Sequence, residues 1–149
     1  MKIAIGGETL FWTSPKPPER TLCLCERGSV RSVTLASVLK DYYGYADVLA
    51  AGLATTTKVT LGLLRAWAQL VIVVGNVDLA VLAYEKGLRD IKLLDVGTDR
   101  WLMPMHPDLV GEIVLMLERT GLPRVAIYYS NKETYLRAVN AAWERLKIT

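Results

Sequence analysis

Cys25 and Arg31 are the two residues whose types and spacing most directly suggest chemistry. Cys25 ends an apolar run that begins at Leu22, and five residues separate it from the pair Arg31-Ser32. Unpaired N–H groups at a helix N-terminus stabilise a cysteine thiolate, which is a nucleophile, and a short loop can turn its amides toward an oxyanion. An arginine adds two parallel donors for phosphate oxygens. The pattern predicts a thiolate that attacks phosphorus and forms a cysteinyl-phosphate intermediate.

The segment between Cys25 and Arg31 has a composition that suits such a loop. Gly28 tolerates the positive φ that a tight curl requires, and Ser32 is placed to donate a hydrogen bond to the sulfur and to help cap the helix. The residues predicted to surround a substrate are Glu26, Arg27, Gly28, Ser29, Val30 and Ser32. The alternative interpretation is a buried cysteine at a strand end, with Arg31 on a solvated helix face.

Composition sets limits on the class of protein. A chain of 149 residues, 52% hydrophobic and 22% charged, suits one folded domain, 1–149, in which residues 1–20 form an irregular extension. A net charge of +3 is too weak to predict nucleic-acid binding and is compatible with an anionic substrate. No apolar run is long enough to span a membrane. The segment Met1–Gly7 reaches glycine too early for a signal peptide, so we expect a cytoplasmic protein.

The chain has two cysteines, Cys23 and Cys25, two residues apart on a predicted strand. An extended backbone holds their α-carbons near the upper limit for a disulfide, and a bridge this short would staple nothing. We therefore expect two free thiols and a reducing compartment.

Strands and helices alternate along the rest of the sequence. Short apolar or β-branched runs predict strands at 2–5, 21–25, 47–51, 70–74, 91–94 and 125–129. Amphipathic segments with start and stop residues predict helices at 32–43, 57–67, 77–86 and 107–120. Ser130 and Glu133 form a capping box that predicts a last helix reaching Leu146.

This alternation predicts a mainly parallel, twisted sheet of four to five strands, with helices on both faces. Ligand sites of such three-layer α/β folds lie beyond the carboxyl ends of the strands. Cys25, Gly52, Gly75 and Asp95 each follow or end a predicted strand. We therefore expect Gly52, Gly75 and Asp95 at the same edge of the sheet as Cys25.

The sequence from Thr21 to Leu117 resembles the low-molecular-weight protein tyrosine phosphatase family, and most closely its short bacterial and phage members. The resemblance rests on the segments Cys25–Ser32, Ala50–Gly52, Leu64–Val73, Leu94–Trp101 and His106–Leu109. It implies that Cys25 is the nucleophile, that Arg31 binds the phosphate and that Ser32 interacts with the thiolate. It also implies the three-layer fold and a phosphorylated protein or small phosphomonoester as substrate, without a cofactor or metal.

Three departures from the family pattern concern the same site. The family usually has an asparagine inside the loop, where this sequence has Gly28-Ser29, which can supply the same turn. Val30 stands where many members have a second cysteine that protects the nucleophile. The family's Asp-Pro-Tyr-Tyr segment is absent, so three residues compete for the role of general acid: Asp99, Asp95 and Asp108. We favour Asp99, because an acid followed closely by an aromatic residue best matches the family's loop. That aromatic residue, Trp101, would flank an aryl phosphate or anchor the loop.

Other functions remain as alternatives. The loop could bind an anion or a phosphoprotein without catalysis, in a pseudophosphatase that has lost the acid. It could reduce arsenate with an external thiol, because no cysteine follows Cys25. A phosphocarrier site would not require Arg31. His106 is the sole histidine, so no second histidine can complete a metal site.

Overall fold

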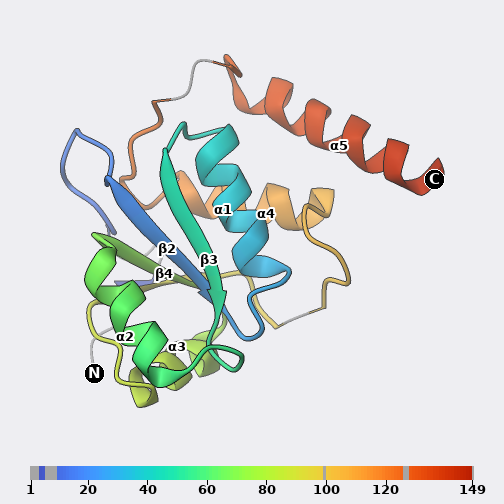
Figure 1. Ribbon diagram of the computed structural model, residues 1–149. Helices are drawn as coiled ribbons and strands as arrows, with labels where there is room; N and C mark the ends of the chain where they lie inside the picture. The colour runs from blue at the N-terminus through green and yellow to red at the C-terminus, as the bar shows by residue number, and fades with distance from the viewer. Residues whose placement is uncertain (1–3, 6–9, 99, 126–127, 149) are drawn as a thin grey trace.

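The computed structural model describes residues 4–5, 10–98, 100–125 and 128–148 and shows one five-stranded parallel sheet (Figure 1). The strands lie in the order β1-β5-β4-β2-β3. Their bounds are Ala4–Ile5 for β1, Arg20–Cys25 for β2, Asp47–Gly52 for β3, Leu70–Gly75 for β4 and Ile91–Asp95 for β5. The predicted three-layer α/β fold is confirmed.

Helices cover both faces of the sheet. They are α1 (Arg31–Asp41), α2 (Lys58–Trp67), α3 (Val77–Glu85), α4 (Pro107–Leu117) and α5 (Lys132–Ile148). Helices α1 and α4 pack on one face, and α5 packs on α4; α2 and α3 pack on the opposite face (Figure 1). This division follows from right-handed crossovers, because the chain leaves β2 toward β3 and then returns past β2 to β4 and β5.

The sheet divides at its carboxyl edge, between β2 and β4. Leu24 is the last residue of β2 that pairs with β4, opposite Val73. Beyond that point Cys25 pairs with Gly52 of β3, and Gly75 of β4 pairs with β5. The connections that leave β2 and β4 also run to opposite faces, which is the topology that opens a binding crevice in parallel sheets.

The helix boundaries follow local chemistry. The Thr57 hydroxyl accepts a hydrogen bond from the N–H of Thr60 at the start of α2, and the Asn76 side chain accepts one from the N–H of Leu79 at the start of α3. Pro107 opens α4, where its missing N–H has no cost. Gly44 and Gly87 follow α1 and α3 with φ values of +81° and +92°, which glycine adopts most readily.

The prediction of a strand at 125–129 was wrong. Val125 and Tyr128–Tyr129 are not in a strand, while residues 126–127 of the predicted strand lie outside the described residues. The N–H of Val125 instead donates to the carbonyl of Tyr43, after α1. The edge of β5, beside which a strand following α4 would lie, is occupied by β1.

The last helix begins one residue later than the capping box predicts. The side chain of Asn131, not Ser130, accepts a hydrogen bond of 2.9 Å from the N–H of Thr134. Asparagine and serine cap helices about equally well, so sequence alone did not decide between these neighbours. Helix α5 then continues to Ile148, two residues beyond the predicted end.

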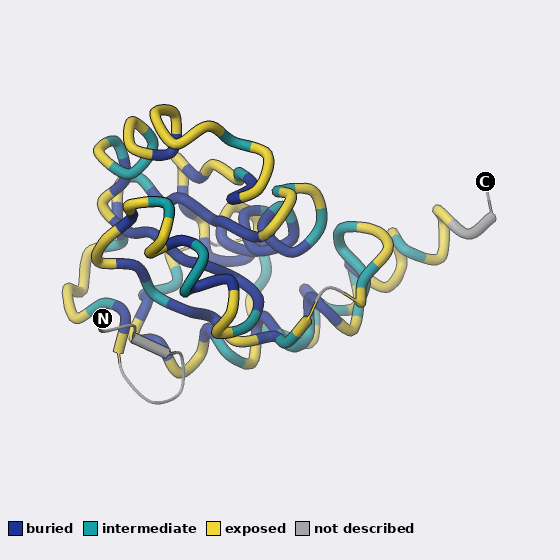
Figure 2. The backbone as a smooth tube through the Cα atoms, turned by 90° about the horizontal axis from the view of Figure 1, so that it is seen from below, coloured by how far each residue is buried: buried dark blue, intermediate teal, exposed yellow. Residues whose placement is uncertain are grey.

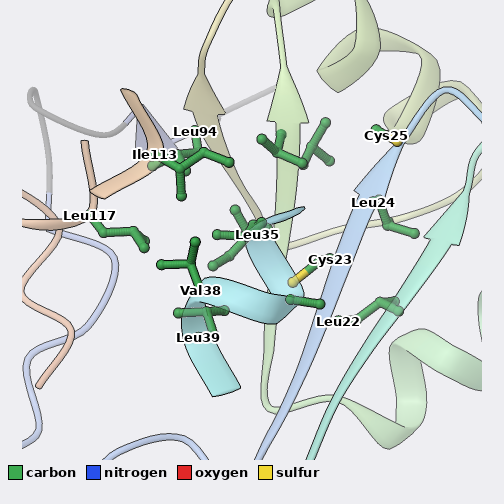
Figure 3. Close-up of a cluster of buried hydrophobic side chains, with 14 of the residues drawn as sticks. Leu22, Cys23, Leu24, Cys25, Leu35, Val38, Leu39, Leu94, Ile113 and Leu117 are labelled. Atoms are coloured by element: carbon green, nitrogen blue, oxygen red, sulfur yellow. The ribbon is translucent and has the colours of Figure 1, made fainter. Parts of the chain in front are cut away.

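The core lies on both sides of the central strands (Figure 2). Every residue of β4 is buried, and so are Thr21–Cys25 of β2. Figure 3 shows Cys23 on the side of the sheet that faces α1, near Leu35 and Leu39. Phe11, from the irregular N-terminal segment, is also buried, and its N–H donates to the carbonyl of Thr120. No helix in the described part of the chain is long and apolar enough to cross a membrane.

Candidate active site

The sulfur of Cys25 lies at the carboxyl end of β2, beside the start of α1. Its Sγ is 3.2 Å from the Ser32 hydroxyl oxygen and accepts a hydrogen bond of 3.2 Å from the N–H of Gly28. The sulfur is thus within hydrogen-bond distance of two polar groups, one from the loop and one from the first turn of α1. The structure thus brings together three residues that the sequence predicted to act as a unit.

The loop between Cys25 and Arg31 is fixed from behind by the segment that follows β3. The donors are the N–H groups of Leu53 and Ala54 (2.8 Å each) and the hydroxyl of Thr55 (3.2 Å), and the acceptors are the carbonyls of Cys25, Glu26 and Arg27, in that order. A trans peptide points its N–H opposite to its carbonyl. The next N–H groups, those of residues 26, 27 and 28, are therefore directed away from this segment. The bond from Gly28 to the sulfur is the observed example.

Two glycines permit this close approach of backbones. Gly28 has a φ of +73°, and a Cβ on it would lie 2.5 Å from the N of Gly52. A Cβ on Gly52 would in turn collide with the carbonyl of Arg27. Since backbone atoms cannot rotate away as a side chain can, side chains are excluded at both positions. The glycine predicted inside the loop and the one predicted after β3 thus meet in one contact.

Arg31 is the first residue of α1, yet it is only 2% exposed. Its Nη1 donates a hydrogen bond of 3.0 Å to the carbonyl of Gly97. A Cβ on Gly75 would lie 2.7 Å from the same nitrogen, so the guanidinium passes directly over Gly75. The N–H groups of Val96 and Gly97 donate to the carbonyl of Gly75 and fix the two segments together. This placement excludes a solvated Arg31, whereas the other part of that alternative, a buried cysteine at a strand end, agrees with the 3% exposure of Cys25.

A cleft of about 280 Å³ opens where the guanidinium lies. It is lined by Glu26, Arg31, Asn76, Asp78, Leu79, Leu82 and Thr98. Of these, Glu26 and Arg31 were predicted site residues, whereas Asn76 and Asp78 were not. Asn76 directly follows Gly75, which the sequence analysis placed at this edge of the sheet. This position next to Gly75 was the signal by which Asn76 could have been predicted as a site residue.

The two cysteines lie in different environments, although they are two residues apart. Cys23 is fully buried, and this burial raises the pKa of its thiol far above the usual range. Cys25 is 3% exposed and has the two polar neighbours described above. Both thiols are free, as predicted. The environment therefore supports Cys25, and not Cys23, as the nucleophile.

The rest of the loop joins the site to the chain that precedes α4. The carbonyl of Val30 accepts hydrogen bonds from the N–H of Thr34 (2.9 Å) and from its hydroxyl (2.7 Å). The same Thr34 oxygen accepts one of 2.9 Å from the N–H of Met105. Thr34 is buried and was not predicted, because its partner is distant in sequence. Arg27 and Ser29 of the loop are exposed.

The candidate general acids differ in their positions. Asp99, the favoured candidate, lies outside the described residues; the preceding residue, Thr98, lines the cleft. Asp95 is exposed, and its Oδ1 accepts a hydrogen bond of 3.0 Å from the N–H of Gly97. Asp108 is in the first turn of α4 and lines a different pocket. Neither Asp95 nor Asp108 is among the residues that line the cleft.

Trp101 belongs to that second pocket, which has a volume of about 640 Å³. Its ring centroid is 5.0 Å from that of His106, and His106 is 4.9 Å from Trp143 of α5. Trp101 is not among the residues that line the Arg31 cleft, so its contact with a substrate stays a prediction. His106 caps α4, with its Nδ1 accepting from the N–H of Asp108. The described residues hold no group of three or more His, Cys, Asp or Glu suited to a metal.

Comparisons with known proteins add no assignment. No family model, no curated protein and no solved structure matches the chain. The functional argument therefore depends on the geometry around Cys25 and Arg31, together with the sequence resemblance described above.

Proposed function

We propose that this protein is a cysteine-dependent phosphomonoester hydrolase of the low-molecular-weight tyrosine phosphatase type. One observation carries the proposal: the Cys25 sulfur has the Ser32 hydroxyl and the Gly28 N–H each at 3.2 Å. The guanidinium of Arg31, which begins the helix after the loop, lines the cleft together with Glu26, the residue that follows Cys25. A substrate phosphate that contacts both Cys25 and Arg31 would meet a nucleophile and a cationic anchor for its oxygens.

The reaction would proceed in two displacements. In the first, the Cys25 thiolate attacks phosphorus, an S–P bond forms, and the bond from phosphorus to the leaving oxygen breaks. That oxygen takes a proton from the general acid, for which Asp99 is the proposed residue. In the second, water attacks phosphorus and gives its proton to the same carboxylate. The S–P bond breaks, which releases phosphate and restores the thiolate.

Arg31 and the loop amides would stabilise the charge on the three non-bridging phosphate oxygens in both steps. The loop is suited to this role because its carbonyls are engaged behind it. A phosphate oxygen would therefore meet N–H groups without reorganisation of the loop. The substrate would be a phosphorylated protein or a small phosphomonoester, and the chemistry requires no metal or cofactor.

Hydrolysis of para-nitrophenyl phosphate tests the proposal. We expect turnover by the wild type, none by Cys25→Ser, and a loss of about 100-fold or more in Arg31→Lys, which keeps the charge but not the paired donors. Cys23→Ala is the matched control and should remain active. Mass spectrometry of a rapidly quenched reaction should find one phosphoryl group on the peptide that contains Cys25. Activity that survives Cys25→Ser would overturn the proposal.

The acid is tested with Asp99→Asn, Asp95→Asn and Asp108→Asn. Loss of the true acid slows esters of poor leaving groups, such as alkyl phosphates, more than para-nitrophenyl phosphate, because the nitrophenolate needs little protonation. We expect this selective loss in Asp99→Asn alone. Equal behaviour of all three variants would refute the assignment of Asp99.

The main alternative is an anion-binding protein without catalysis. The hydrogen bond between Asp95 and Gly97 favours it, because it engages one candidate acid within its own turn. Vanadate binding without phosphatase turnover would support this alternative. Reduction of arsenate would need an external thiol, since Cys23 is fully buried. Arsenate-dependent oxidation of added thiol, with no phosphatase activity, would identify that reaction.

A further inference from the structure

The cleft beside Arg31 has a charge pattern unlike that of a simple phosphate site. Two acidic side chains, Glu26 and Asp78, line it together with the guanidinium. Both are exposed, and neither belongs to a salt bridge among the described residues. A dianionic phosphate bound by Arg31 would therefore lie close to two carboxylates, neither of which forms a salt bridge within the described part of the chain.

The position of Asp78 adds to this pattern. Asp78 lies in the first turn of α3, two residues after the Asn76 cap, where the helix dipole favours a negative side chain. The proposed acid belongs to another segment, the loop after β5, so Asp78 is not needed to protonate the leaving group. The negative charge of Asp78 remains in the cleft when a substrate is bound. It therefore disfavours binding of a substrate with a neutral or anionic leaving group relative to one with a cationic leaving group.

The remaining lining is aliphatic and polar. Leu79 is 7% exposed and Leu82 is half-buried, and Asn76 and Thr98 provide the other polar surface. The described residues that line the cleft include no aromatic side chain on which an aryl ring could stack. Methylene groups can pack against the two leucines, and a cation at the end of such a chain would meet the carboxylates.

We propose that the cleft selects alkyl phosphomonoesters whose leaving group carries a cation, such as an ammonium group a few carbons from the ester oxygen. This inference rests on the proposed phosphatase activity and adds the class of leaving group. The leaving group extends along Leu79 and Leu82, and its positive charge offsets the repulsion between the phosphate and the side chains of Glu26 and Asp78.

Three substrates of similar size test the inference: aminopropyl phosphate, butyl phosphate and carboxypropyl phosphate. The measured quantity is the ratio of kcat/KM between substrates, compared between wild type and variant, so intrinsic differences between leaving groups cancel. In Asp78→Asn we expect the preference for aminopropyl over butyl phosphate to fall about 1.5- to fivefold, the range of one solvent-exposed charge pair. Carboxypropyl phosphate should improve relative to butyl phosphate in the same variant.

Glu85→Gln is the matched control, because Glu85 is an exposed acid at the far end of α3 and does not line the cleft. It should leave both ratios as in the wild type.

A lysine-flanked phosphoserine peptide and its glutamate-flanked counterpart determine whether the cation comes from a peptide or from a small molecule. If the enzyme discriminates between the two peptides but not among the three small esters, the inference that its substrates are small alkyl phosphomonoesters is wrong.

Failure of the inference and failure of the proposed function give different results. If para-nitrophenyl phosphate is hydrolysed in a Cys25-dependent manner and the ratios do not change in Asp78→Asn, the inference alone is wrong. If no Cys25-dependent turnover of any ester occurs, the proposed function is wrong and the inference falls with it. Thermal unfolding of Asp78→Asn, compared with wild type, shows whether the variant is folded.

Discussion

Gly75→Ala tests whether the proposed phosphatase activity depends on the position of the Arg31 guanidinium. An added Cβ would lie 2.7 Å from Arg31 Nη1 and would also collide with the Leu79 side chain. Unstrained contacts of this kind lie at about 3.5 Å, so the guanidinium has to move by about 0.8 Å. No other candidate catalytic residue is changed by this substitution.

A displacement of this size has a large expected effect on rate and a moderate one on stability. Misplacement of a positioning group by about 1 Å can cost about 100-fold, which corresponds to about 2.7 kcal/mol of transition-state stabilisation. Overpacking of a buried contact costs about 1–3 kcal/mol, and for a domain of this size that lowers Tm by about 3–10 °C. We therefore expect a folded protein with a severely reduced kcat/KM.

The assay measures para-nitrophenyl phosphate hydrolysis, vanadate affinity and thermal unfolding on the same preparations. Gly62→Ala is the control, since a Cβ at that exposed position in α2 meets nothing within 4 Å. It should be fully active and more stable by about 0.5–1 kcal/mol, because alanine favours a helix over glycine. A folded Gly75→Ala protein with wild-type kcat/KM would refute the role assigned to the guanidinium.

Three other substitutions or treatments test the parts that surround it. Gly28→Ala should abolish activity and cost about 2–5 kcal/mol in chemical denaturation, because a positive φ and a backbone collision coincide there; a stable, active variant would contradict the loop geometry. In native protein, iodoacetamide should label Cys25 and spare Cys23, because burial raises the pKa of the Cys23 thiol and blocks access to it. Peptide mapping would identify the labelled cysteine, and labelling of Cys23 in the native protein would contradict this prediction. Thr34→Val should cost about 1–3 kcal/mol and speed hydrogen exchange at the Met105 amide, whose acceptor is lost; unchanged exchange would show that the bond does not hold this segment.

The central elements could be predicted because their boundaries are marked in the sequence. The run from Leu70 to Val74 has length, β-branching and a closing Gly75, and it is the fully buried β4. Pro107 marks the start of α4. By contrast, the apolar segment around Val125 had the composition of a strand but no free sheet edge, since β1 occupies that position. Competition for an edge is a tertiary property that no local pattern encodes.

In the site, too, contacts between residues close in sequence could be predicted, and contacts between distant residues could not. Cys25, Gly28 and Ser32 lie within one loop and helix start, so the contacts of the sulfur with the other two could be predicted from spacing. The roles of Gly75 and the carbonyl of Gly97 could not, because these residues are 44 and 66 positions from Arg31. The sequence did indicate that Gly75 lies at the correct edge, but not that a side chain crosses it.

The division of the sheet explains why a loop anchored on one strand can place its arginine against another. Up to Leu24, β2 is held between two neighbours, and Cys23 is accordingly sealed between Ala50 and Ile72. One residue later, pairing with β4 has ended and Cys25 keeps its partner on β3 alone. Arg31, which begins the helix on one face, reaches across this opening to Gly97 in the segment after β5. The sulfur and the guanidinium are thus held by opposite halves of the divided edge. A substrate phosphate that contacts both would bridge the halves, so saturating vanadate should raise Tm in the wild type and not in Arg31→Ala.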